Sequence, residues 1–203
     1  EGVLELLAGL VDLVLAGQSG GSTLIASMLT RGRSDVACAV LGSGAYELVD
    51  LVHGSIRRGG GEASERSIAR VVYDPSTQIE GVPADARRRI FVVGDPADTR
   101  TPFDQQQRFA EALTAAGHHA RLIPIMATGE LHHGATTYSL PLAALCARDA
   151  NDARITKAAA DMRSSAEKRL REGAGGPTRL RVSPDFRDRT RRGSNSAAGE
   201  KRG

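Results

Sequence analysis

The stretch LVDLVLAGQSGGSTLIASMLTRG, residues 10–32, decides the fold of this chain. It begins with a short apolar run from Leu10 to Ala16, rich in Leu and Val, which is typical of a β-strand. It ends in a segment from Ser22 onward that carries apolar residues at helical spacing. The positions between them, 17–21, hold glycine, glutamine and serine, which favour a turn. The stretch therefore predicts a strand, a tight turn and a helix in direct succession.

Further apolar runs follow at 36–41 (VACAVL), 90–94 (IFVVG) and 120–126 (ARLIPIM). These runs are continuous rather than alternating, which indicates strands buried on both faces, as in a parallel sheet. Pro124 lies in the last run and cannot donate a hydrogen bond to a neighbouring strand, so this strand is expected at the sheet edge. The sequence therefore predicts an α/β fold: a parallel sheet of about four strands, in sequential order, flanked by helices.

Helices are predicted between and after these strands. Residues 45–89 are interpreted as a crossover of helix and loop with an insertion. After the third strand, Thr101 is a candidate cap and Pro102 suits the first helical position, and this helix ends near Gly117. A further helix is expected to begin at Pro141.

The composition of the 203 residues is that of a folded domain, with 40% hydrophobic and 25% charged residues. No apolar run approaches the roughly 20 residues that a membrane span requires. Two cysteines, Cys38 and Cys146, are too few for a disulfide framework, so both are expected to be buried free thiols. Because the sequence opens with Glu1 rather than Met, it is expected to be a fragment or a processed product, and its localisation stays open.

Charge is unevenly distributed along the chain. The net charge is +3, yet residues 151–203 hold 14 Lys and Arg against 7 Asp and Glu, which leaves the preceding part net acidic. This pattern disfavours a nucleic-acid partner for the folded body. It suggests three parts: a body over 1–150, a helical extension over 151–172, and a basic tail over 173–203 that is rich in Gly, Ser and Arg and is predicted to be disordered.

The turn at 17–21, GQSGG, fits the pattern G-x-S-x-G in the strand-turn-helix context of a nucleophile elbow. In such a turn the glycines at 17 and 21 are expected to prevent clashes, because the backbone segments approach closely. Ser19 would project near a helix N-terminus, whose N–H groups favour developing negative charge. The backbone N–H of Gly20 is the predicted oxyanion donor.

A serine nucleophile requires a base, and the base requires an acid to orient it; in this motif they follow in the order serine, acid, histidine. Asp98 lies after the third predicted strand, and His132 and His133 lie after the fourth. In a parallel sheet these loops emerge at one edge, so the three kinds of side chain are expected to converge there.

Three segments resemble the prolyl oligopeptidase-like serine hydrolases of the α/β-hydrolase superfamily: GQSGGS at 17–22, GDPADTRTPFDQQQRFAEALTAAGH at 94–118 and GELHHG at 129–134. The similarity covers roughly residues 1–150 and corresponds to the C-terminal part of the catalytic domain. It implies a partial α/β-hydrolase fold.

The resemblance also implies roles for single residues. Asp98 stands four residues before Pro102, as the acid does in the family's D-x-x-x-P segment, with Asp95 as a minor competitor. His132 occupies the histidine position of the family's G-x-x-H loop and is the favoured base. His133 is the alternative, because it directly precedes a glycine as in the peptidases of the family.

We therefore expect a serine hydrolase that cleaves a small ester or a peptide bond through Ser19, His132 and Asp98, by way of an acyl-enzyme and without a cofactor or metal. The alternative is a non-catalytic or incomplete hydrolase-like module with an Arg-rich interaction tail. About half of a complete hydrolase sheet has no counterpart in the sequence, so the chain alone is expected to be poorly active. Its oligomeric state and its choice between peptide and ester stay open.

The tail generates a first prediction. Truncation of the chain after Gly173 should leave the midpoint of thermal unfolding nearly unchanged, because a segment with few apolar residues cannot bury enough surface to offset its chain entropy. Calorimetry of the full and the truncated chain measures this. A large loss of stability in the truncated chain would show instead that the tail packs on the body.

Overall fold

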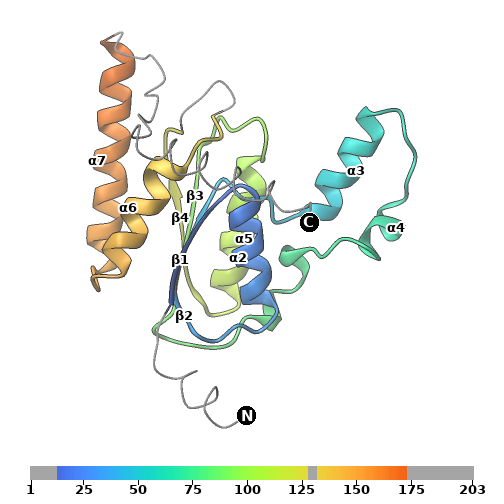
Figure 1. Ribbon diagram of the computed structural model, residues 1–203, viewed down its shortest axis with the longest axis horizontal. Helices are drawn as coiled ribbons and strands as arrows, with labels where there is room; N and C mark the ends of the chain where they lie inside the picture. Colours follow the sequence, from blue (N-terminus) through green and yellow to red (C-terminus); the bar gives the residue numbers. More distant parts are fainter. Residues whose placement is uncertain (1–12, 128–131, 173–203) are drawn as a thin grey trace, which may run out of the picture.

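The computed structural model describes residues 13–127 and 132–172, and its centre is one parallel sheet (Figure 1). The sheet contains four strands in the order β1-β2-β3-β4. Their bounds are Leu13–Gln18 for β1, Val36–Gly42 for β2, Arg89–Gly94 for β3 and His119–Pro124 for β4. The predicted α/β fold, its parallel strands and their sequential order are confirmed, and β4, which ends at Pro124, is an edge strand.

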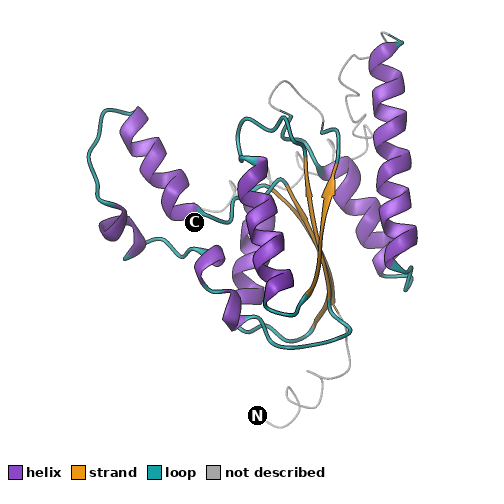
Figure 2. Cartoon of the chain, turned by 180° about the vertical axis from the view of Figure 1, so that it is seen from behind, coloured by secondary structure: helices purple, strands orange, loops and turns teal. Residues whose placement is uncertain are grey.

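Helices cover both faces of this sheet (Figures 1 and 2). One face is covered by α2 (Gly20–Thr30) and α5 (Phe103–Ala115), and the other by α6 (Thr136–Cys146) and α7 (Asp152–Arg171). Neighbouring residues of each strand point to opposite faces. In β3, for example, Ile90 and Val92 face α2 and α5, while Phe91 and Val93 face α6 and α7.

The helix α7 packs on the body rather than extending away from it. Its Ile155 and Ala159 are fully buried, and they join the same core cluster as Phe91 and Leu142. The segment predicted as a helical extension is therefore helical and contributes to the core. Its last residues are exposed, including Leu170, and residues 173–203, the predicted tail, lie outside the described residues.

The crossover between β2 and β3 contains the predicted insertion. Its elements are α3 (Leu48–Arg58), α4 (Glu65–Ala69) and short 3-10 turns at Pro75–Thr77 and Ile79–Gly81. None of the residues of α3 is fully buried, and α3 and α4 stand away from the sheet on the side of α2 (Figure 1). The 3-10 turns return the chain to the core, where Ile79 packs against the α2 side of the sheet.

Two helix starts differ from the sequence prediction. α6 begins at Thr136, and Pro141 lies inside it rather than at its first position. The helix continues through this residue because its apolar face, with Tyr138 and Leu142, is buried against the sheet. α5 begins at Phe103 without a side-chain cap, since the Thr101 hydroxyl is bonded elsewhere, as described below.

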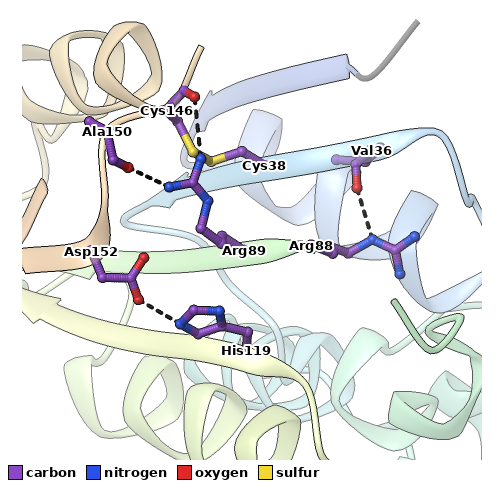
Figure 3. The surroundings of a disulfide bond; sticks show 8 residues. All are labelled: Val36, Cys38, Arg88, Arg89, His119, Cys146, Ala150 and Asp152. Atoms are coloured by element: carbon purple, nitrogen blue, oxygen red, sulfur yellow. Dashed lines mark hydrogen bonds and ion pairs between the residues drawn. A yellow bond between two sulfur atoms is a disulfide. The ribbon is translucent and has the colours of Figure 1, made fainter. Parts of the chain in front are cut away.

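Two consecutive arginines connect the sheet to its surroundings (Figure 3). Arg88 is buried, and its guanidinium donates hydrogen bonds to the carbonyls of Ser34, Val36 and Pro83. Arg89 donates to the carbonyls of Cys146 and Ala150, where α6 ends and the chain turns toward α7. Backbone carbonyls thus satisfy both cations, which would otherwise be costly to bury.

Cys38 and Cys146 form a disulfide bond across β2 and the end of α6 (Figure 3). The expectation of free thiols is therefore wrong, although both residues are buried as expected. The two cysteines are 108 residues apart in sequence, and only the packing of α6 against the sheet brings them together. The described residues contain no free cysteine.

Among the helices in the described part of the chain, none is both long enough and apolar enough to cross a bilayer.

The disulfide closes a long loop, and a cross-link of that kind stabilises a fold by about 2 to 5 kcal/mol, mainly by restricting the unfolded chain. The double variant Cys38→Ala/Cys146→Ala should lose stability of this order in guanidinium unfolding. A reductant should destabilise the original chain by a similar amount and leave the double variant unaffected. Detection of two free thiols in the unreduced, denatured chain would contradict the bond.

Candidate active site

The serine of the elbow lies at the junction of β1 and α2 in a strained backbone conformation. Ser19 has a φ of 54°, a left-handed value that residues other than glycine adopt rarely and mostly where the surrounding structure enforces it. Its N–H donates to the carbonyl of Gly42 at the end of β2, at 2.8 Å. The local geometry therefore agrees with the turn that the motif predicts.

The two glycines that flank this serine have different surroundings. A Cβ atom on Gly17 would lie 2.6 Å from the backbone carbon of Gly21 and from the nitrogen of Ser22, whereas one on Gly21 would meet no atom within 4 Å. Only the first glycine is required by close packing. The expectation that both positions exclude side chains therefore holds for Gly17 and fails for Gly21.

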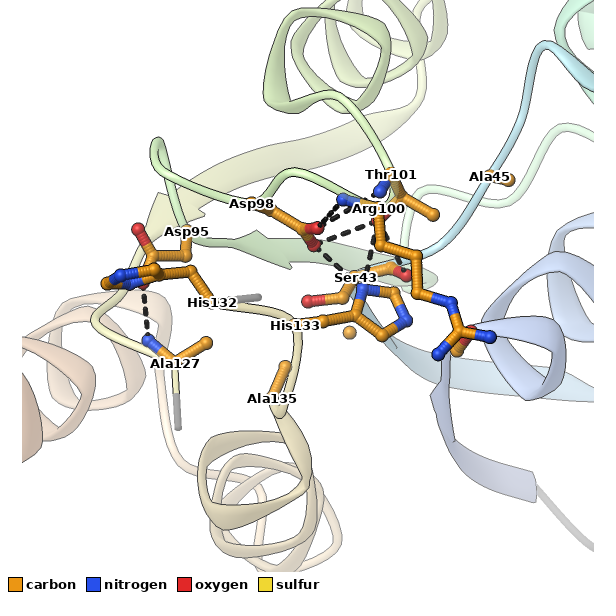
Figure 4. Close-up of polar contacts among 12 residues, drawn as sticks. Ser43, Ala45, Asp95, Asp98, Arg100, Thr101, Ala127, His132, His133 and Ala135 are labelled. Atoms are coloured by element: carbon orange, nitrogen blue, oxygen red, sulfur yellow. Dashed lines mark hydrogen bonds and ion pairs between the residues drawn. The ribbon is translucent and has the colours of Figure 1, made fainter. Parts of the chain in front are cut away.

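Asp98 holds His133, and not His132, at the carboxyl edge of the sheet (Figure 4). The fully buried carboxylate of Asp98 accepts a hydrogen bond from Nδ1 of His133 at 2.9 Å. It also accepts bonds from the backbone N–H groups of Arg100 and Thr101 and from the Thr101 hydroxyl. Four donors thus surround one buried carboxylate.

The other ring nitrogen of His133, Nε2, is buried and has no hydrogen-bond partner among the described residues. In the neutral imidazole, the nitrogen that faces a carboxylate carries the proton, so the geometry assigns the proton to Nδ1 and the acceptor role to Nε2. This is the tautomer that a general base requires.

His132 pairs with the other carboxylate, that of Asp95, at 3.2 Å between Nδ1 and Oδ2. Asp95 also accepts from the backbone N–H groups of Ala97 and Ala127. The side chain of His132 is 46% exposed, against 13% for His133. The geometry thus separates two His–Asp pairs, and it favours the alternative histidine over the one preferred from the sequence. The chain turns sharply at His132, whose φ is 51°, and the two adjacent side chains reach different carboxylates.

Ser19 opens into a cleft of about 290 Å³. The residues that line the cleft are Ser19, Gly20, Thr23, Ala45, Leu48, Leu51, Arg100 and Thr101. The Ser19 hydroxyl has no hydrogen-bond partner among the described residues, so serine and histidine are not joined directly. Thr101 lines the same cleft as Ser19, and its hydroxyl lies 3.3 Å from Nδ1 of His133.

A larger hollow of about 390 Å³ lies beside α3, lined by residues such as His53, Arg57 and Glu62. It contains none of the elbow, acid or histidine residues, and we give it no part in the site. Within the described ranges, no group of three His, Cys, Asp or Glu side chains is placed to hold a metal ion.

Two polar residues of the site were not predicted from the sequence. The Thr101 hydroxyl bonds to Asp98 and to the carbonyl of Ser43 instead of capping α5. Gln18, the variable residue of the motif, bonds to the loop that carries His133. No signal in the sequence marks the bonds to Ser43 or to the His133 loop, because these partners are distant in sequence.

Comparison with known proteins gives similarity at the level of structure alone. No protein-family model matches the chain, and no match was found among curated protein sequences. One similar solved structure is an acylaminoacyl peptidase of Pyrococcus horikoshii, with 15% identity and a TM-score of 0.47 over 68% of this chain and 23% of that one. An esterase of Pyrococcus furiosus has 12% identity and a TM-score of 0.45, over 66% of this chain and 50% of that one. An esterase of Thermogutta terrifontis has 20% identity and a TM-score of 0.45, over 67% of this chain and 56% of that one.

The described residues form a four-stranded parallel sheet flanked by helices, and the chain is similar to these structures over part of their length. It spans about a quarter of the length of the peptidase and about half of the length of the two esterases. At this identity and TM-score the likeness concerns the fold and assigns no substrate.

The different surroundings of the two elbow glycines generate a prediction. Gly17→Ala should destabilise the chain, because its Cβ would overlap backbone atoms that cannot move aside, whereas Gly21→Ala should be neutral or stabilising by up to about 1 kcal/mol, as alanine favours a helix over glycine. Denaturant unfolding of the two variants measures the contrast. Equal effects of the two substitutions would mean that the strand and the helix are not packed as closely as the structure describes.

Proposed function

We propose that this chain carries the nucleophile, base and acid of a serine hydrolase, with Ser19, His133 and Asp98 in these roles. The observation that carries the proposal is the buried Asp98–His133 pair, in which Nε2 of His133 has no hydrogen-bond partner among the described residues. This pair lies at the same sheet edge as Ser19, whose backbone is strained. A structural role for the pair would not require an unpartnered buried nitrogen, which is costly unless another group uses it.

In the proposed reaction, Nε2 of His133 accepts the proton of the Ser19 hydroxyl as its oxygen attacks the carbonyl carbon of an ester or amide. Asp98 keeps the proton of Nδ1 in place and stabilises the imidazolium that forms. The histidine then gives its proton to the leaving alcohol or amine, which leaves an acyl group on Ser19. Water, deprotonated by the same histidine, hydrolyses this acyl-enzyme.

Negative charge on the carbonyl oxygen during this attack would be stabilised at the start of α2. Gly20 is the first residue of that helix and lines the cleft, so its N–H group belongs to the helix N-terminus, where donors have no intrahelical partner. The partial positive charge of the helix end adds to this effect.

The second pair, Asp95 with His132, is less suited to the same role. The Thr101 hydroxyl contacts both Asp98 and His133 and lines the cleft at Ser19, whereas Ala97 and Ala127, which bond Asp95, do not line it. A half-exposed imidazole is also hydrated, which weakens its pairing with a carboxylate. We therefore assign proton transfer to His133.

Fluorophosphonate labelling tests the proposal, because such probes react with an activated serine. We expect labelling of Ser19, identified by peptide mass spectrometry, that is lost in Ser19→Ala and reduced at least a hundredfold in His133→Ala, since a general base contributes about a hundred- to ten-thousandfold. His132→Ala should retain most of the labelling. Ser27→Ala is the matched control, because its hydroxyl bonds only a carbonyl within α2.

Labelling that is lost in His132→Ala and kept in His133→Ala would reverse the histidine assignment. A folded chain with no labelling at Ser19 would favour the non-catalytic module that the sequence leaves as the alternative.

A further inference from the structure

The side chain of Gln18 joins the elbow to the loop that carries the candidate base. Its Nε2 donates to the carbonyl of His133 at 2.5 Å, and its Oε1 accepts from the backbone N–H of Ala135 at 2.7 Å. The Thr136 hydroxyl lies 3.5 Å from the same Oε1. The residue directly before the nucleophile thus contacts the backbone on both sides of Gly134.

The chemistry of the primary amide matches this pair of backbone groups. It presents one acceptor to an N–H and one donor to a carbonyl, and no other ordinary side chain of this length offers both. The orientation of the amide follows from its partners, since a flipped amide would place its NH₂ group against the Ala135 N–H. Gln18 is also half-buried, which limits competition from water for these bonds.

The same loop is held on its other side by Asp95, which bonds the N–H of Ala127 and the ring of His132. His133 therefore lies between two side-chain anchors, one on the β3 loop and one on the elbow itself. The elbow anchor connects the histidine to the strand that positions Ser19. The contact spans 115 residues of sequence.

We propose that Gln18 is a positioning residue, which fixes His133 relative to Ser19 and to Asp98 through the backbone of residues 133–135. The proposal rests on the proposed function for its catalytic consequence, but the geometric effect on His133 does not depend on activity. Without the amide, the loop loses its two hydrogen bonds to Gln18. The ring of His133 can then shift relative to Asp98 and Ser19. A displacement of about 1 Å in such a group can lower a rate about a hundredfold.

Two variants separate the contributions of the amide. Gln18→Leu removes both hydrogen bonds at similar size. Gln18→Glu keeps the oxygen that accepts from the Ala135 N–H. Its second oxygen replaces the donor and should repel the His133 carbonyl oxygen, so only this one bond is lost. The control is Gln107→Leu, because that glutamine is exposed on α5 and bonds only Glu111.

The first measurement is NMR of the Nδ1 proton of His133, assigned by its absence in His133→Ala. We expect a low-field resonance in the original chain and in Gln107→Leu, and its broadening or loss in both Gln18 variants. The second is the rate of fluorophosphonate labelling at Ser19, which should fall about tenfold to a hundredfold in these variants. Thermal unfolding checks that each variant is folded.

An unchanged His133 resonance in a folded Gln18→Leu or Gln18→Glu chain would overturn the proposal. A changed resonance in a chain whose Ser19 never reacts would support the positioning role and count against the hydrolase function alone. If Gln18→Leu does not fold, the same criteria apply to Gln18→Glu, which keeps the bond to Ala135.

Discussion

The close approach of backbone segments at the elbow is the constraint on which the rest of the site depends. Gly17 packs against the first turn of α2 with no room for a Cβ atom, and a Cβ on Gly42 would lie 3.1 Å from both the Gly17 oxygen and the Ala135 side chain. The carbonyl of Gly42 accepts bonds from the Ser19 N–H and the Ser22 hydroxyl. Strand β1, strand β2 and the start of α6 therefore meet at one point, which forces the strained conformation of Ser19 and places the histidine loop beside it.

At that edge the buried charge is balanced locally. Asp95 and Asp98 are each buried, and each accepts hydrogen bonds from two backbone N–H groups and contacts one histidine. A buried carboxylate without such donors would be protonated or would destabilise the fold. The difference between the pairs lies in solvent contact, because His133 is enclosed and His132 is half-exposed. That difference, rather than the distance to a carboxylate, is why we propose His133 for proton transfer.

The disulfide and the candidate site are located at different places on the sheet. Cys38 bonds Cys146 near the end of α6, and Arg89 donates to carbonyls of the same turn. Gln18 and Asp98 lie at the carboxyl ends of the strands, where loops of a parallel sheet collect binding and catalytic groups. The cross-linked face carries α6 and α7, so the helix that begins beside His133 is anchored at its far end.

The sequence alone determined the α/β fold, because buried parallel strands are continuous apolar runs and because a glycine-rich turn between strand and helix is recognisable locally. It also gave Ser19, Asp98 and the pair of histidines as candidates, since residue type and order can be read along the chain. Only the tertiary structure distinguished His133 from His132, because adjacent residues point in different directions once the loop is closed. It alone paired Cys38 with Cys146 and Gln18 with the His133 loop, since contacts between residues more than a hundred positions apart depend on how helices pack on the sheet and leave no local pattern in the sequence.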